Sequence, residues 1–117
     1  MNDTRITATC VDPQERKVYS VKISSALKDA ADIIGCDLIQ LHYIPLAVAG
    51  RTAYTGFICD EEAQLKDGLK GFSIIGQPET FQLFLGKVLF VTMRRNGTRL
   101  RDSTITPDEL RSIVRWV

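Results

Sequence analysis

Histidine and cysteine are scarce in this sequence, and their scarcity excludes several common kinds of site. The chain has one histidine, His42, and three cysteines that form no Cys-x-x-Cys pair. Structural zinc sites combine four Cys or His ligands at short spacings, so we expect no zinc site, and we expect no other metal or cofactor. An odd number of widely separated cysteines predicts reduced, buried thiols in a cytosolic protein rather than a disulfide framework.

Long apolar runs and nucleotide-binding motifs are also lacking. No stretch approaches the ~20 apolar residues that a membrane-spanning helix needs, and the polar opening MNDTRITATC predicts no signal peptide. The glycine-bearing segment 68–77 matches neither a P-loop nor a dinucleotide-binding fingerprint. Because no nucleophile, base and oxyanion donors can be assembled from the sequence, we expect a binding protein rather than an enzyme.

The composition that remains is that of one ordinary soluble domain with an uneven charge. The chain has 117 residues, of which 44% are hydrophobic and 25% charged, enough to bury a single core. From Lys87 onward, seven basic residues face three acidic ones, a net charge of +4, whereas residues 1–86 carry eight basic and eleven acidic residues, a net −3. The basic end predicts an anionic partner, or an acidic patch on the same molecule or on a neighbouring subunit.

Alternating apolar and polar residues predict that most of the chain is β-strand. The expected strands are 5–11, 17–23, 36–44, 52–62, 72–76, 87–95 and 98–104. The expected helices are 24–35, which ends at Gly35, and 106–117, which begins with a capping box of Thr106 and Glu109. One or two helical turns are expected within 77–86, and a loop at 45–51. The order ββ-α-ββ-(α)-ββ-α predicts an α+β domain with a mostly antiparallel sheet and both main helices on one face.

An arginine-rich hairpin is the strongest functional signal in the chain. Four of the eight residues 94–101 are arginine, and Asn96-Gly97 between them is the preferred pair for a two-residue type I′ turn. Residues directly opposite each other in an antiparallel pair share a face of the sheet. The pairs that this turn predicts on one face are Arg94 with Arg99 and Thr92 with Arg101.

Three interpretations of this face remain open: a solvated hairpin tip, a phosphate- or nucleotide-binding face, and a contact with a protein partner or subunit. Guanidinium groups bind phosphate with two parallel hydrogen bonds, and an aromatic ring can stack on a base. Asp102, on the opposite face, is placed to pair with an arginine. The candidate ligand-binding residues are therefore Thr92, Arg94, Asn96, Arg99, Arg101, Asp102 and Phe72.

Other candidate sites have simpler interpretations. The acidic turn Asp60, Glu61 and Glu62 lacks the ligand spacing of a calcium loop and is typical of a solvated turn, although it could also contact a protein partner. His42 and the cysteines are interpreted as core or edge residues rather than catalytic ones. Nucleic acid is a weak candidate partner, since the net charge is only +1 and strong binding rests on several phosphate contacts.

Two resemblances add to this reading of the residues. The run KVYSVKISSALKDAADIIGCDLIQLHYIP, then FICDEEAQLKDG, and the ending TITPDELRSIV resemble a family of small uncharacterised domains of bacteriophages, prophages and plasmids, over roughly residues 17–115. The Pro-Asn pair that often follows the Asp-Glu-Glu turn in that family is replaced here by LKGFSIIG. The arginines and threonine of the hairpin face, beside phenylalanines, are also similar to the pockets of the first family of Thoeris anti-defence proteins.

These resemblances imply a phage or mobile-element protein of the host cytoplasm. The second resemblance implies a homo-oligomer that sequesters a cyclic ADP-ribose isomer or a cyclic oligonucleotide without cleaving it. The alternative function is a protein-interaction inhibitor of a host defence complex, in which the acidic turn would matter more than the arginines.

Overall fold

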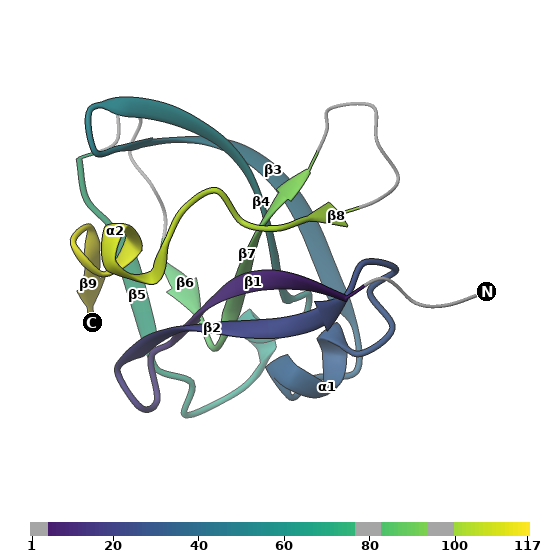
Figure 1. The fold of residues 1–117 in the computed structure, drawn as a ribbon. Coiled ribbons are helices and arrows are strands. Elements are labelled where there is room, and N and C mark those ends of the chain that lie inside the picture. Colours follow the sequence, from purple (N-terminus) through teal and green to yellow (C-terminus); the bar gives the residue numbers. More distant parts are fainter. Residues whose placement is uncertain (1–4, 77–82, 94–99) are drawn as a thin grey trace.

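The computed structural model describes residues 5–76, 83–93 and 100–117, and most of them belong to antiparallel β-strands (Figure 1). The larger sheet has the order β2-β1-β7-β4-β3, and β8 pairs with β7. Its strands are β1 (Arg5–Asp12), β2 (Lys17–Ser24), β3 (Ile39–Val48), β4 (Arg51–Asp60), β7 (Val88–Met93) and β8 (Leu100–Arg101). The smaller sheet has the order β6-β5-β9, with β5 (Gly71–Ile74), β6 (Phe84–Leu85) and β9 (Val114–Trp116). The helices are α1 (Ala30–Ile34), α2 (Pro107–Arg111) and the 3₁₀ turn η1 (Ala63–Leu65).

The centre of the larger sheet is β7, as its continuous apolar sequence predicts. It pairs with β1 on one side and β4 on the other. Val88 and Phe90 belong to one core cluster and Leu89 and Val91 to another, and all four are fully buried. Because side chains alternate between the faces of a strand, the two clusters lie on opposite faces of the sheet.

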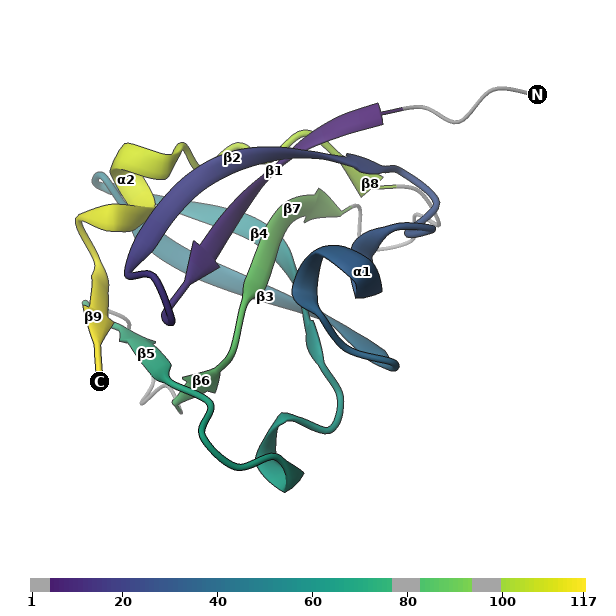
Figure 2. The same ribbon diagram turned by 90° about the horizontal axis from the view of Figure 1, so that it is seen from below.

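The two α-helices cover different faces of this sheet, so the expectation that both pack on one face is wrong. Leu110 of α2 joins the cluster of Val88 and Phe90, whereas Ala30 and Ile34 of α1 join the other cluster. In Figure 2 the smaller sheet lies to the left of β7 and α1 to its right. The physical reason is that β7 buries both of its faces, and each face needs a cover.

The first expected helix, 24–35, is helical only over α1. Before it, the Ser24 hydroxyl accepts the Ala26 N–H at 3.1 Å, and the Asp29 carboxylate accepts the Ser24 N–H at 2.9 Å. Leu27 has a left-handed φ of 64°. Because these side-chain hydrogen bonds turn the backbone, the helix begins only at Ala30. It ends at Gly35, as predicted.

The last expected helix, 106–117, stops at Arg111. Its start is confirmed, since Thr106 and Glu109 form a complete capping box. Its end is wrong, because Val114–Trp116 is a strand that pairs with β5. Val114 and Trp116 lie in this strand and pack against the core cluster of Val88 and Phe90.

Two further corrections concern loops. The expected loop 45–51 is the end of β3, a two-residue turn and the first residue of β4, and both turn residues, Ala49 and Gly50, have positive φ as a type I′ turn requires. Of the helical turns expected within 77–86, residues 77–82 lie outside the described residues, and Phe84–Leu85 is a strand. In the described ranges, every helix is too short or too polar to cross a membrane.

Candidate ligand-binding site

The register of the arginine hairpin is confirmed at its base. Thr92 lies opposite Arg101, and Met93 lies opposite Leu100. The first of these is the pair that a two-residue Asn96-Gly97 turn predicts. Arg94, Asn96 and Arg99 lie outside the described residues, so the second predicted pair stays a prediction.

Among the described arginines, Arg101 forms no ion pair, and Arg16 and Arg115 share this property. Arg5 pairs with Asp29 at 2.7 Å, Arg51 pairs with Glu109 at 2.7 Å, and Arg111 pairs with Asp108. Arg101 is exposed on β8 and forms no ion pair with any residue of the described ranges. Its charge is therefore not neutralised by a described carboxylate.

Asp102 does not neutralise Arg101 although it follows directly in the chain. Its carboxylate oxygen Oδ1 accepts the backbone N–H of Thr7 at 2.7 Å. The bond joins the segment after β8 to β1 across the sheet. We therefore assign Asp102 a structural role. It lies beside the hairpin, as the sequence predicts, because it directly follows β8.

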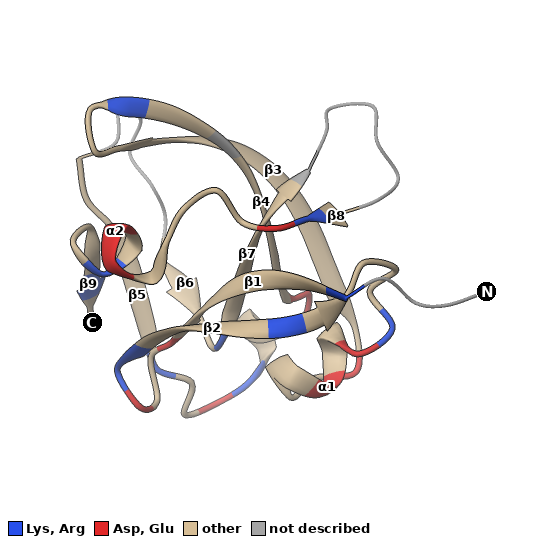
Figure 3. Ribbon diagram, viewed as in Figure 1, with Lys and Arg blue, Asp and Glu red and all other residues tan. Residues whose placement is uncertain are grey.

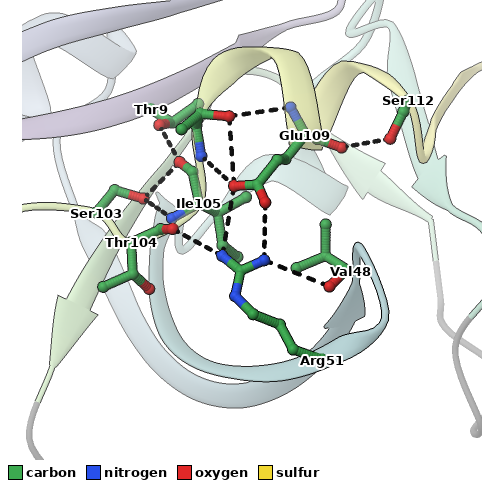
Figure 4. A network of polar contacts seen from close by, with 9 residues as sticks. Thr9, Val48, Arg51, Ser103, Thr104, Ile105, Glu109 and Ser112 are labelled. Carbon is green, nitrogen blue, oxygen red and sulfur yellow. Dashed lines mark hydrogen bonds and ion pairs between the residues drawn. The ribbon is translucent and has the colours of Figure 1, made fainter.

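The Thr92 side chain is half-buried, and its oxygen accepts the Thr104 N–H at 3.1 Å. The same segment is held to β1, because Ser103 donates its N–H to the Thr7 carbonyl at 2.8 Å. Thr9 donates its hydroxyl to the Ile105 carbonyl at 2.8 Å (Figure 4). The base of the hairpin is thus fixed by hydrogen bonds to β1.

An arginine that the sequence did not single out completes this network. The Arg51 guanidinium donates to both oxygens of Glu109, at 2.7 Å and 3.3 Å, and to the Thr104 carbonyl at 2.9 Å (Figure 4). The pKa of Glu109 lies below its usual value of 4.5, and the largest cause is the hydrogen bond from Arg51. The hydrogen bond from the Thr106 N–H is the second cause. This arginine joins the β3–β4 hairpin to α2 and is occupied by the protein itself. The capping box marked Glu109 in the sequence, but no local signal marked its partner.

Phe72 is a core residue and not a platform for a base, which corrects the sequence-based assignment. Its side chain has 0% exposure, and its ring stacks on Phe84 with centroids 5.0 Å apart. The Trp116 ring packs at 6.3 Å in an edge-on geometry. A ring with no exposed surface has no face to offer a ligand. Phe81 and Phe84 are the other two phenylalanines that could stack on a base; Phe84 is buried at 5% exposure, and Phe81 lies outside the described residues.

A cavity of about 260 Å³ lies at the other end of β7, beside Val88. His42, half-buried and 4.8 Å from the Phe57 ring, forms part of its wall, in keeping with its interpretation as a core or edge residue. The lining includes Asp60 and Glu61 but no Lys or Arg among the described residues. The cavity therefore does not suit a phosphate group.

The acidic turn is neutralised within the chain at one of its three carboxylates, that of Asp60. Asp60 is buried at 7% exposure, and its carboxylate accepts the Lys66 ammonium at 2.6 Å and the Glu62 N–H at 2.8 Å. The hydrogen bond that Lys66 donates to Asp60 raises the pKa of Lys66. Glu61 is exposed and Glu62 is half-buried, and neither carboxylate forms an ion pair within the described residues.

The cysteines and other polar groups form no metal site in the described part of the chain, where no cluster of three His, Cys, Asp or Glu could hold a metal ion. Cys10 is fully buried, whereas Cys36 and Cys59 are half-buried, so the expectation of buried thiols holds fully only for the first. Burial raises the pKa of all three thiols.

Comparison of the chain with protein-family models, with curated proteins and with solved structures finds no match. The candidate site therefore rests on its own geometry: an exposed, unneutralised arginine and a threonine hydroxyl, paired across the base of a hairpin that is tied to the sheet.

Proposed function

We propose that this protein binds a small phosphorylated ligand of nucleotide type at the arginine hairpin and retains it without chemical change. The observation that carries the proposal is Arg101. It lies opposite Thr92 on the hairpin and forms no ion pair with a described residue, whereas Arg5, Arg51 and Arg111 are each paired. Arg16 and Arg115 are unpaired as well, but neither belongs to the hairpin.

An unneutralised guanidinium suits phosphate because it offers two parallel donors in a fixed plane. The Thr92 oxygen already accepts one hydrogen bond, which leaves the hydroxyl proton for a ligand oxygen. In the proposal, the two-residue turn that Asn96-Gly97 predicts brings Arg94 and Arg99 to the same face, with Asn96 at the turn. In the proposal these residues supply the further phosphate and polar contacts.

Retention rather than turnover is supported by the state of the thiols. The reactive form of cysteine is the thiolate, and a raised pKa keeps a thiol protonated near neutral pH. The pKa values of all three cysteines are raised, so none of them is an activated nucleophile. Sequestering an immune signal such as a cyclic nucleotide, in the cytoplasm of a phage-infected cell, requires affinity alone and is the specific role that we propose.

The test is a capture-and-release experiment. The purified protein is incubated with cyclic dinucleotides, cyclic trinucleotides and cyclic ADP-ribose isomers, freed of unbound ligand and heat-denatured, and the released compound is identified by mass spectrometry. We expect one intact nucleotide in stoichiometric amount. A chemically altered nucleotide would show turnover, and no capture from any member of the panel would refute the proposed function for this ligand class.

Two arginine variants make the test specific for the hairpin. We expect Arg101→Gln to lose capture, since it removes the charged guanidinium and keeps an uncharged polar side chain. The matched control is Arg115→Gln, which removes an exposed arginine of β9 whose register partner is Ser73, in the smaller sheet. Equal capture by the two variants would exclude Arg101 as a ligand contact.

The alternative function, inhibition of a host defence complex through the acidic turn, has less support. Asp60 is buried and paired with Lys66, so the turn offers a partner less negative charge than its sequence suggests. We expect a host protein that co-purified through this turn to be released by Glu61→Gln, and no such release from a variant of the hairpin.

A further inference from the structure

The cavity of about 260 Å³ is built on the face of the larger sheet that α2 also covers. On this face His42 of β3 lies opposite Phe57 of β4. The next pair on the same face is Gln40 with Cys59, and all four residues line the cavity. The remaining walls come from β6 and from the turn 60–64. Its volume is near the lower end of the range for ligand pockets, so the cavity suits a small molecule.

The cavity combines an apolar base with polar side chains that the described part of the protein does not engage. Phe57 and Phe84 are buried at 4% and 5% exposure, and their rings pack edge to face with centroids 5.2 Å apart. The side chains of Gln40, His42 and Gln64 form no hydrogen bond with any described residue. An apolar surface with a few polar groups left to orient a ligand is typical of small-molecule sites.

The charge of this lining is negative. It includes the carboxylates of Asp60 and Glu61 but no Lys or Arg among the described residues, and β3 and β6 carry no charge at all (Figure 3). Lys66 neutralises Asp60 at 2.6 Å. Lys87 directs its ammonium to the Ile33 carbonyl of α1 at 3.4 Å, on the other face of the sheet. Glu61 forms no ion pair in the described ranges, so its carboxylate sets the charge of the cavity.

We propose that this cavity binds a small organic cation, with the charged head at Glu61 and the apolar body against the base of the cavity. An amidinium or guanidinium head matches a carboxylate with two parallel N–H donors, and the side-chain oxygens of Gln40 and Gln64 accept further N–H groups. An anion would meet the Glu61 carboxylate with no cation to offset it. Val88 beside the cavity and Thr92 of the arginine hairpin lie at opposite ends of β7, so this site is independent of the proposed function.

The test is an NMR titration of the isotopically labelled wild type with benzamidinium, benzamide and benzoate, which have nearly the same shape and differ in charge. We expect benzamidinium to shift the side-chain amide signals of Gln40 and Gln64, which line the cavity. The amide signal of Gln14 should stay unchanged, because this residue lies outside the lining and its side-chain oxygen accepts the Lys70 N–H at 3.1 Å. Benzamidinium should bind about tenfold more tightly than benzamide, as expected for a charge-assisted hydrogen bond, and benzoate should not bind.

Two variants of the same turn identify the carboxylate that the cation contacts. Glu61→Gln keeps the shape of the side chain and removes its charge, so it should bind benzamidinium no more tightly than benzamide. The matched control is Glu62→Gln, which removes the same charge one residue further on and outside the lining. It should keep the preference of the wild type for benzamidinium. Equal losses in the two variants would overturn the assignment of Glu61.

The titration of the wild type decides the proposal even if a variant does not fold. Equal affinities for benzamidinium, benzamide and benzoate would refute the preference for a cation. Signals that shift only outside the lining, or no shift at the highest soluble concentration of benzamidinium, would refute the site. Nucleotide capture at the hairpin is a separate measurement, so either proposal can fail while the other holds.

Discussion

The Ile105 carbonyl lies at the junction of the hairpin and α2, and its hydrogen bonds yield a quantitative prediction. It belongs to a residue with 0% exposure and accepts the hydroxyls of Thr9 at 2.8 Å and Ser103 at 3.0 Å. A buried hydrogen bond contributes about 1 kcal/mol net. Thr9→Val removes one donor and keeps the side-chain shape, while Ser103 still serves the carbonyl. We therefore expect the free energy of unfolding to fall by about 1 kcal/mol.

The double variant Thr9→Val, Ser103→Ala removes both hydroxyl donors from the same carbonyl. Leaving a buried carbonyl without a partner costs about 1–3 kcal/mol beyond the lost bond. The double variant should therefore be less stable than the sum of the single variants predicts, with a coupling free energy of about 1 kcal/mol or more. Ser103 also accepts the Ile105 N–H at 3.2 Å. This hydrogen bond is lost in Ser103→Ala and in the double variant alike, so its loss does not contribute to the coupling free energy.

The assay is urea-induced equilibrium unfolding of the wild type, the two single variants and the double variant. The slope of the unfolding free energy against urea concentration must be the same for all four proteins, because only then do differences in midpoint report differences in stability. Additive effects would refute the reasoning that the two hydroxyls share one acceptor. A Thr9→Val variant as stable as the wild type would refute the contribution of the first bond.

Three further predictions concern α2 and the core. Thr106→Ala removes the capping box and should lower the free energy of unfolding by about 1 kcal/mol in urea unfolding, and a change no larger than that of an exposed control substitution would contradict it. The pKa of Glu109 is lowered from 4.5 in the folded chain, chiefly by Arg51, so its contribution to stability is present above pH 4.5 and is lost as the pH falls through the lowered pKa. Glu109→Gln should accordingly be less stable than the wild type near neutral pH, with a difference that shrinks in acid; a difference independent of pH would argue against the ion pair. Phe72→Leu should cost about 1–3 kcal/mol of stability but leave the affinity for a captured nucleotide unchanged, because the ring is fully buried, and a selective loss of affinity would place the ring in the site.

The parts of the candidate site that local patterns could predict are those determined by neighbouring residues. A two-residue turn sets the register of the strands it joins, so Asn96-Gly97 led to the Thr92–Arg101 pair that the structure contains. The capping box at Thr106 and Glu109 is likewise a four-residue signal. Both were read correctly because the interacting groups lie close together in the chain.

The parts that were missed depend on residues that are far apart in the chain. Arg51 and Glu109 are separated by 58 positions, and nothing local to either residue indicates the other. Whether an apolar ring such as Phe72 is buried or presented to a ligand depends on what covers it, here Phe84 and Trp116 from two other strands. Periodicity reports that a face is apolar but not which element packs on it.

The sequence by itself determined the strand-rich, mostly antiparallel character of the protein, the central position of β7 and the register at the base of the hairpin. These follow from side-chain alternation and turn chemistry, which act over a few residues. Only the tertiary structure decided that α1 and α2 cover opposite faces and that the chain after α2 becomes a strand beside β5. It also decided which arginines are neutralised by the protein. These outcomes depend on contacts between distant segments, whose free energies exceed the local preference of a five-residue helix or a single side chain.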